Sequence, residues 1–303
     1  MPHRSALRAY AALALGVVAI SWSAIFVRWT QMPGVASAFY RVFIAALILW
    51  AILIARRTRL QMNCSALWLA ILGGAFFAGD LGFYNVSVLR TSAGSATFLG
   101  NNAPLFVAII SWIATRRAPS GRFWIAFAIA LVGACLIVSP DLQHSGTRSA
   151  ADLMAVAASF CFALYLSLTE RLREAGSTLT LLAISTTSSA AVLLLVAALT
   201  HSSLRIPSTQ SLASLIGLGV VCQLVGYFGL TYALGHLPAT VSSVVMLTMA
   251  PITAVLALIL FKERMTFLQV FGGALVLLGV WIVSRSGRES TPPSSSQMAQ
   301  VAP

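Results

Sequence analysis

The chain has 303 residues, of which 59% are hydrophobic and only 9% are charged, and its mean hydropathy is +0.91. Soluble domains carry about 25% charged residues, so the composition excludes an ordinary soluble protein and indicates an integral membrane protein. A net charge of +12 would suggest nucleic-acid binding in a soluble chain. Here the basic residues lie mostly between apolar runs, as topology signals do, and we expect no nucleic-acid partner.

Apolar runs of spanning length recur along the whole chain. A helix that crosses a bilayer needs about 20 mostly apolar residues. The sequence offers ten candidates, at residues 9–28, 35–55, 67–88, 93–115, 122–139, 152–169, 179–200, 211–234, 239–260 and 266–284. We therefore predict an all-α integral membrane protein with ten transmembrane helices. The Ser- and Pro-rich tail 286–303 is expected to be disordered and cytoplasmic.

The basic residues also predict the orientation, because Lys and Arg concentrate on the cytoplasmic side. With the N-terminus inside, the inner loops hold Arg4, Arg8, Arg56, Arg57, Arg59, Arg116, Arg117, Arg122, Arg171, Arg173, Arg285 and Arg288. The outer loops then hold Arg28, Arg90, Arg148, Arg205, Lys262 and Arg264, and Arg41 falls inside a span. Twelve against six predicts that both termini face the cytoplasm.

The two halves of the sequence echo each other. Adding 147 to a residue number carries Gly82 to Gly229, Ser95 to Ser242, Ala103 to Ala250 and Pro104 to Pro251. We predict two repeats, at 1–148 and 149–285, with five spans each. An odd number of spans inserts the halves in opposite senses, which gives an inverted repeat around a central cavity. Many transporters have this architecture, with the substrate near the membrane midplane.

The chain resembles the EamA domain of the drug/metabolite transporter superfamily over about residues 9–284. The resemblance is carried by Leu237-Pro238-Ala239, Ala250-Pro251, Glu263-Arg264 and the pair Gly272-Gly273, and in the first half by Trp22, Tyr40-Arg41 and Pro104. The segment RRAPSG at 116–121 has no acid to match Glu263. The order and composition are most similar to YddG-type bacterial exporters of aromatic and other neutral amino acids. This resemblance implies a multi-pass protein of the bacterial inner membrane.

Pro104 and Pro251 lie near the middle of spans 93–115 and 239–260. Proline removes a backbone hydrogen bond and clashes with the carbonyl four residues earlier, here those of Gly100 and Leu247. Two interpretations stay open. The prolines form flexible points for alternating access, or they form static kinks that shape the bundle.

Polar and aromatic side chains within the spans are candidates for the cavity lining. In span 93–115, Phe98 and Asn102 share a helical face and Asn101 lies one step round, so that two amides beside a ring would suit an amino acid. The alternative is that the amides bond between helices. The other lining candidates are Trp22, Tyr84, Tyr165, Gln223, Tyr227, Ser243 and Met246. The alternative for the aromatic ones is anchoring at the membrane interface.

Arg41 and Asp80 both fall in the outer half of a predicted span. An ion pair between them is the simplest way to keep two charges in a bilayer. The alternative makes Asp80 a proton-coupling carboxylate.

These features predict a secondary transporter that exports small neutral metabolites, most of all aromatic and other neutral amino acids, by alternating access. Multidrug or other metabolite efflux is the alternative. An intramembrane enzyme is disfavoured, because no second aspartate lies well inside a span to face Asp80 and no histidine lies deep. A structural protein would not explain the proline-broken hairpins. We expect no cofactor, no metal and no obligatory protein partner, because the cysteines and histidines lack metal-ligand spacing.

Overall fold

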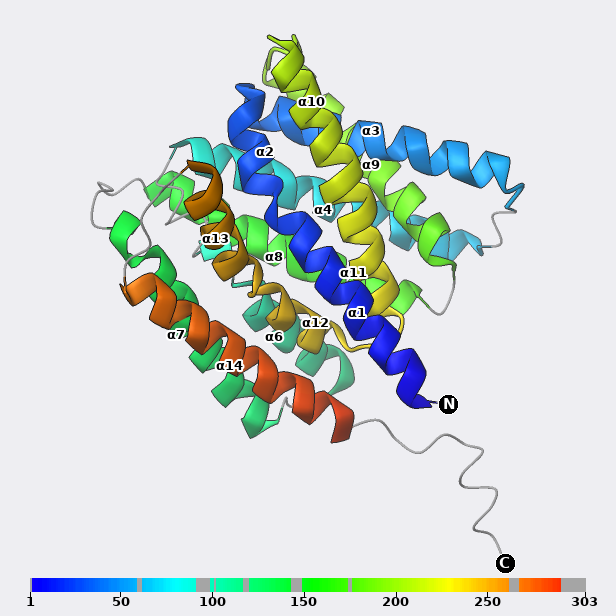
Figure 1. Ribbon diagram of the computed structural model, residues 1–303. Coiled ribbons are helices and arrows are strands. Elements are labelled where there is room, and N and C mark those ends of the chain that lie inside the picture. The colour runs from blue at the N-terminus through cyan, green and yellow to red at the C-terminus, as the bar shows by residue number, and fades with distance from the viewer. Residues whose placement is uncertain are drawn as a thin grey trace, which may run out of the picture.

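The computed structural model describes residues 2–58, 62–90, 99–100, 102–116, 120–142, 149–173, 176–261 and 267–289. Within them every regular element is a helix, and the helices pack into one bundle (Figure 1). The first half contains α1 (Pro2–Ser21), α2 (Ser23–Thr30), α3 (Gly34–Ala55), α4 (Cys64–Arg90), α6 (Ala103–Thr115) and α7 (Gly121–Leu142). The second half contains α8 (Ser149–Leu172), α9 (Thr178–Leu199), α10 (Thr209–Gly217), the π-helix η1 (Leu218–Gly226), α11 (Tyr227–Leu234), α12 (Ala239–Met246), α13 (Met249–Phe261) and α14 (Phe267–Glu289).

The described helices are apolar enough for a multi-pass membrane protein. By length and composition, seven helical segments can cross a bilayer, at Leu7–Thr30, Gly34–Ala55, Cys64–Ser87, Leu153–Leu172, Thr178–Leu199, Thr209–Leu234 and Ala239–Leu260. Shorter apolar helices at Ala103–Ala114, Gly121–Leu136 and Val270–Ile282 lie in the predicted spans 93–115, 122–139 and 266–284. An all-helical membrane fold is therefore confirmed, while the total of ten spans and the inversion of the halves stay predictions.

Several predicted boundaries need correction. The helix α14 continues to Glu289, four residues into the tail 286–303 that we expected to be disordered, and the rest of that tail lies outside the described residues. The predicted spans 9–28, 211–234 and 239–260 are each divided into more than one helix. By contrast α4 and α8, which correspond to the predicted spans 67–88 and 152–169, are continuous.

Hydroxyl side chains mark two of the divisions. At the end of α1, the Ser21 hydroxyl donates to the carbonyl of Val17 at 2.7 Å. Between α12 and α13, the Thr248 hydroxyl donates to the carbonyl of Val245 at 2.7 Å. Such bonds from a hydroxyl back to the preceding turn compete with the helical backbone bonds and often bend transmembrane helices. Local chemistry therefore explains these divisions.

Helices from the two halves pack in reciprocal pairs: where the two helices of such a pair are in contact, their counterparts in the opposite halves are also in contact. α4 packs on α8, and α1 packs on α11, with which it runs side by side in Figure 1. In the same way the contact of α6 with α8 corresponds to that of α13 with α1, and the contact of α4 with α9 to that of η1 with α3. In the pairs α3 with α9 and α7 with α14, the two helices are each other's counterparts in the two halves. A duplicated unit is expected to produce such a set.

Glycines let helices of opposite halves approach closely. A Cβ atom added to Gly16 of α1 would lie 2.7 Å from the carbonyl oxygen of Gly226 in η1. One added to Gly133 of α7 would lie 2.7 Å from the backbone nitrogen of Val276 in α14. Small residues are the usual means of close packing between membrane helices, where lipid removes the hydrophobic driving force.

The substitution Gly16→Ala tests this packing. The added methyl group must push α1 away from η1, and overpacking of this kind costs about 1–3 kcal/mol. We expect a lower melting temperature of the purified protein in detergent. Gly82→Ala is the matched control, because its Cβ would lie 3.6 Å from Leu193 Cδ2, an ordinary contact. Equal melting temperatures for the two variants would contradict the close approach.

Candidate functional site

Two of the interrupted spans are joined in the bundle, the one containing α1 and α2 and the one containing α12 and α13. Trp22 occupies the turn between α1 and α2, is half-buried, and its ring centroid lies 5.9 Å from that of Phe26. The Ser21 carbonyl just before this turn accepts a hydrogen bond from the Thr253 hydroxyl of α13 at 3.0 Å. The end of α1 is thus joined to the helix that follows the division at 247–248. In lipid such bonds are required, because water does not reach the freed backbone groups.

Arg41 of α3 joins three other elements. Its Nε donates to Gln223 Oε1 in η1 at 3.0 Å, and its Nη1 donates to the Ser23 hydroxyl in α2 at 2.9 Å. The guanidinium carbon lies 5.4 Å from the centre of the Tyr227 ring, a cation–π arrangement. Arg41 is 5% exposed and Gln223 is fully buried, so this charge is held inside the protein. The predicted candidates Gln223 and Tyr227 therefore meet at Arg41.

The predicted ion pair between Arg41 and Asp80 is not among these contacts. The two hydrogen bonds of the guanidinium go to Gln223 and Ser23 instead, because an amide and a hydroxyl reach it directly. Asp80 is half-buried on α4 and interacts with Arg41 only through space. Within the described part of the chain, Asp80 also acts electrostatically on Cys161, Tyr165 and Tyr227.

Aromatic rings continue the cluster toward α4 and α8. The Phe77 ring of α4 stacks on that of Tyr165 in α8, with 4.7 Å between the ring centres, and lies at the same distance from the Tyr227 ring. The Phe162 ring lies 6.2 Å from that of Tyr165. Our list of candidates omitted Phe77 and Phe162. Their positions in the sequence could have indicated them, since Phe77 lies one helical turn before Asp80 and Phe162 lies one turn before Tyr165, on the same helical faces.

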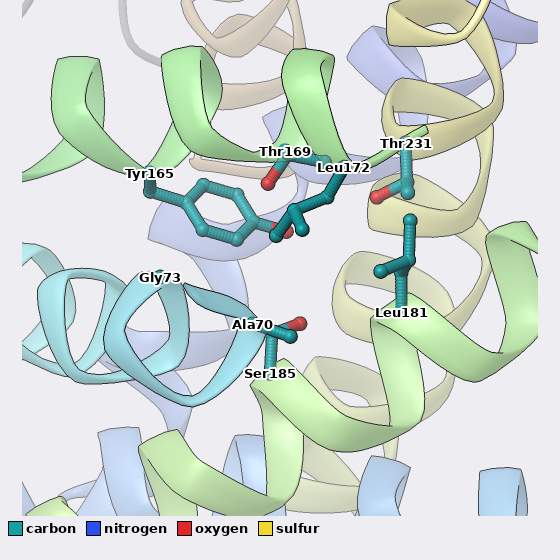
Figure 2. A pocket seen from close by; sticks show the side chains of 8 residues that line it. All are labelled: Ala70, Gly73, Tyr165, Thr169, Leu172, Leu181, Ser185 and Thr231. Carbon is teal, nitrogen blue, oxygen red and sulfur yellow. The ribbon is translucent and has the colours of Figure 1, made fainter. Parts of the chain in front are cut away.

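A small pocket adjoins this cluster. Figure 2 shows the Tyr165 ring extending from α8 into a space that is bordered by Thr169, Ser185 and Thr231. The remaining lining comes from Ala70, Gly73, Leu172 and Leu181. It has room for roughly one water molecule. Tyr165 is 1% exposed, which excludes the alternative of an anchor at the membrane interface.

Asn102 and Pro104 form the start of α6. Asn102 is half-buried and occupies the position before the helix, where its Nδ2 donates to the Leu99 carbonyl at 3.0 Å. Pro104 is the second residue of α6, a place that suits proline because no intrahelical donor is lost there. A Cβ added to Gly100 would lie 3.2 Å from Cδ2 of the predicted candidate Tyr84, so this segment borders α4. Phe98 and Asn101 lie outside the described residues.

The second proline has an equivalent place. Pro251 is the third residue of α13, after the division at 247–248. The Leu247 carbonyl, which we expected Pro251 to leave free, accepts from the Ala250 backbone at 3.2 Å. The candidates Ser243 and Met246 are buried in α12, on the other side of the division, and α12 packs on α1, α6, α8, α11 and α14. Both prolines therefore lie in the first turn of a helix, Pro104 in α6 and Pro251 in α13.

Comparison with known proteins decides the family. The model of the EamA-like transporter family matches residues 7–139 and 149–285. This chain belongs to the EamA-like transporter family. This match confirms the family that the sequence resembles. The chain is therefore a multi-pass membrane protein, and its family is one of transporters rather than of enzymes.

Similar proteins agree with this membership. An uncharacterized transporter of Archaeoglobus fulgidus is 30% identical over 207 residues, which cover 67% of this EamA chain and 72% of that protein. The uncharacterized transporter YwfM of Bacillus subtilis is 26% identical over 226 residues, 72% of each chain. A crystal structure of a protein superposes with a TM-score of 0.78 at 16% identity, covering 95% of this chain and 98% of that one. This last likeness shows the fold alone.

The Phe77 ring should hold the aromatic cluster together. Replacing a buried Phe by Ala costs about 3–5 kcal/mol in soluble proteins, and we expect the packing part of it here, about 2 kcal/mol. Phe77→Ala should therefore lower the melting temperature in detergent. Phe83→Ala on the same helix is the control, because Phe83 is 39% exposed. An equal effect of both substitutions would show that Phe77 is not part of a packed cluster.

Proposed function

We propose that this chain is a secondary transporter that exports small neutral metabolites, aromatic and other neutral amino acids foremost, by alternating access. The observation that carries the proposal is the buried cluster of Arg41, Gln223, Phe77, Tyr165 and Tyr227, beside which the interrupted helices meet. Ligand sites are mostly apolar, with a few placed polar groups, and this cluster has that composition.

The irregular backbone supports the same proposal. A π-helix inside a longer helix is costly in regular structure and is found frequently at functional sites. Here η1 holds Gln223 and is followed at once by Tyr227, so both side chains project from the irregular part of their span. Divided membrane helices are typical of transporter sites near the midplane. We propose that the cluster is this site, and that the dividing points at 22, 102 and 247–248 change shape during transport.

The halves supply a basis for alternating access. The family model matches one range in each half, and these ranges agree closely with the proposed repeats 1–148 and 149–285. The reciprocal helix pairs also support an exchange of roles between the halves. We propose that the halves are inverted, that ten spans are present, and that both termini lie in the cytoplasm. The start of α1 and the end of α14 lie toward the same side of the bundle in Figure 1.

Transport is tested with the purified protein in proteoliposomes. Uptake of labelled phenylalanine, tryptophan, leucine, alanine and glutamate is measured together with that of a lipophilic cation. We expect the neutral amino acids to move and the others to remain outside. Movement of the cation alone would favour the multidrug alternative, and movement of no compound would exclude the amino-acid proposal. Protein-free liposomes give the background.

We propose that the site extends toward α6 and includes Tyr84 and Asn102. We expect Tyr84→Ala and Asn102→Ala to reduce the rate of phenylalanine uptake at least about tenfold, because each removes a proposed contact with the substrate. The amounts of reconstituted protein must be equal. Unchanged uptake in both variants would show that the site does not extend to these residues.

Asp80 is proposed to carry the coupling proton, since Arg41 does not bind it directly. A neutral carboxylic acid is far less costly in a membrane than a carboxylate, so protonation changes the energy of the site. We expect phenylalanine uptake by the wild type to depend on a pH gradient and uptake by Asp80→Asn to be independent of it. Asp80→Glu keeps an acid and should keep the dependence. Full dependence in Asp80→Asn would exclude this role.

A further inference from the structure

Two buried donors of the cluster have no hydrogen-bond partner. They are Nη2 of Arg41 and Nε2 of Gln223. Arg41 is 5% exposed and Gln223 is fully buried, so neither nitrogen reaches solvent. A buried donor without an acceptor is destabilising, and more so when it carries charge. The same two side chains are bonded to each other through Arg41 Nε and Gln223 Oε1 at 3.0 Å.

The orientation of the Gln223 amide follows from its partner. Arginine has five donors and no acceptor, so the amide must turn its oxygen toward Arg41 Nε. Its Nε2 is then directed elsewhere, and it remains a donor. The bonded pair therefore offers two nitrogens whose N–H groups are unsatisfied, and one of them belongs to a charged side chain. Such a pair matches a group that only accepts hydrogen bonds and carries a negative charge.

We propose that this pair binds the carboxylate of the transported molecule. The inference rests on the proposed transport function and assigns the chemical group that the site recognises. A carboxylate has two oxygens and accepts bonds from two donors at once. The Tyr227 ring, 5.4 Å from the guanidinium carbon, holds the guanidinium in place on one face. Ser23 fixes Nη1 at 2.9 Å, so that Nη2 is the end of the guanidinium left for the ligand.

Asp80 would recognise the ammonium group of the same molecule. It lies one helical turn from Phe77, whose ring contacts that of Tyr227, and it interacts electrostatically with Arg41. A molecule with a carboxylate alone would bring a net negative charge beside Asp80. An α-amino acid brings a carboxylate and an ammonium, which match Arg41 and Asp80 with no net change of charge. Because an unpaired charge is expensive at this depth, the site should prefer the zwitterion.

The first test is binding of four compounds that share one ring to the full-length wild-type protein in detergent. The probes are L-phenylalanine, L-phenylalaninamide, phenethylamine and phenylacetate, and the readout is isothermal calorimetry. We expect phenylalanine to bind at least about tenfold more tightly than the amide and the amine, which lack the carboxylate. We also expect it to bind more tightly than phenylacetate, which lacks the ammonium. Equal binding of phenylalanine and its amide would overturn the carboxylate assignment.

Gln223→Glu is the sharpest variant. It keeps an oxygen for Arg41 Nε, and it replaces the free Nε2 donor by an oxygen that repels a carboxylate. We expect the preference for phenylalanine over phenylalaninamide to disappear, with an unchanged melting temperature. Ser188→Ala is the control, because this hydroxyl donates to the Ile71 carbonyl at 2.7 Å, between α9 and α4 and outside the pair. A retained preference in Gln223→Glu would overturn the assignment.

The outcomes separate this inference from the proposed function. If proteoliposomes take up phenylalanine but the amide binds equally well, the carboxylate assignment fails and amino-acid transport stands. If only the amine or the amide binds and is transported, the assignment and the amino-acid proposal fail together, and transport of another substrate stands. If phenylacetate binds as tightly as phenylalanine, the carboxylate site is supported and the role of Asp80 toward the ammonium is excluded.

Discussion

A charged guanidinium inside a membrane protein must be solvated by the protein itself, and much of the central architecture meets this requirement at Arg41. Its Nη1 donates to a hydroxyl at the start of α2 and its Nε to an amide in the π-helix, and the face of an aromatic ring lies beside the guanidinium. Each of these groups comes from a place where a span is interrupted or has just been interrupted. The irregular backbone and the buried charge therefore belong to one arrangement, in which elements far apart in sequence are fixed around a single cation.

The interior of the protein near Arg41 has two regions of different composition. Around Phe77, Tyr165 and Tyr227 the packing is aromatic and close, whereas the neighbouring hydroxyls of Thr169, Ser185 and Thr231 border a small pocket. Rings give a small apolar molecule a large contact area without the cost of many ordered side-chain torsions. Scattered hydroxyls add polar contacts of adjustable direction. An interior of this type is better suited to a ligand that enters and leaves than a uniformly aliphatic core.

The sequence predicted the class of fold and part of the site, and the failures have physical reasons. Runs of apolar residues gave the spans, because hydropathy and length control membrane insertion. The deep aromatics Tyr165 and Tyr227 and the amide Gln223 were found because polar tips are rare in lipid. For Arg41 the sequence indicated only an opposite charge, and it did not indicate the neutral groups on α2 and η1 that accept hydrogen bonds from the guanidinium. No residue pattern marked the π-helix, because it has no proline and differs from an α-helix by only one residue in its hydrogen-bond spacing.

The two halves are alike in their pairings but unequal in their regularity. The partners α4 and α8 are continuous helices, whereas the corresponding partners, α1 and α11, adjoin a turn at Trp22 and the π-helix. A perfect duplicate would give two conformations of the same energy, related by a two-fold axis, so that neither direction of opening would be favoured. The pair α4 and α8 is thus expected to be stiff, whereas the pair α1 and α11 is expected to bend next to its irregular backbone. If the halves exchange roles during a transport cycle, the two end states differ in energy even with no substrate bound, and the empty protein has a resting direction set by its own backbone.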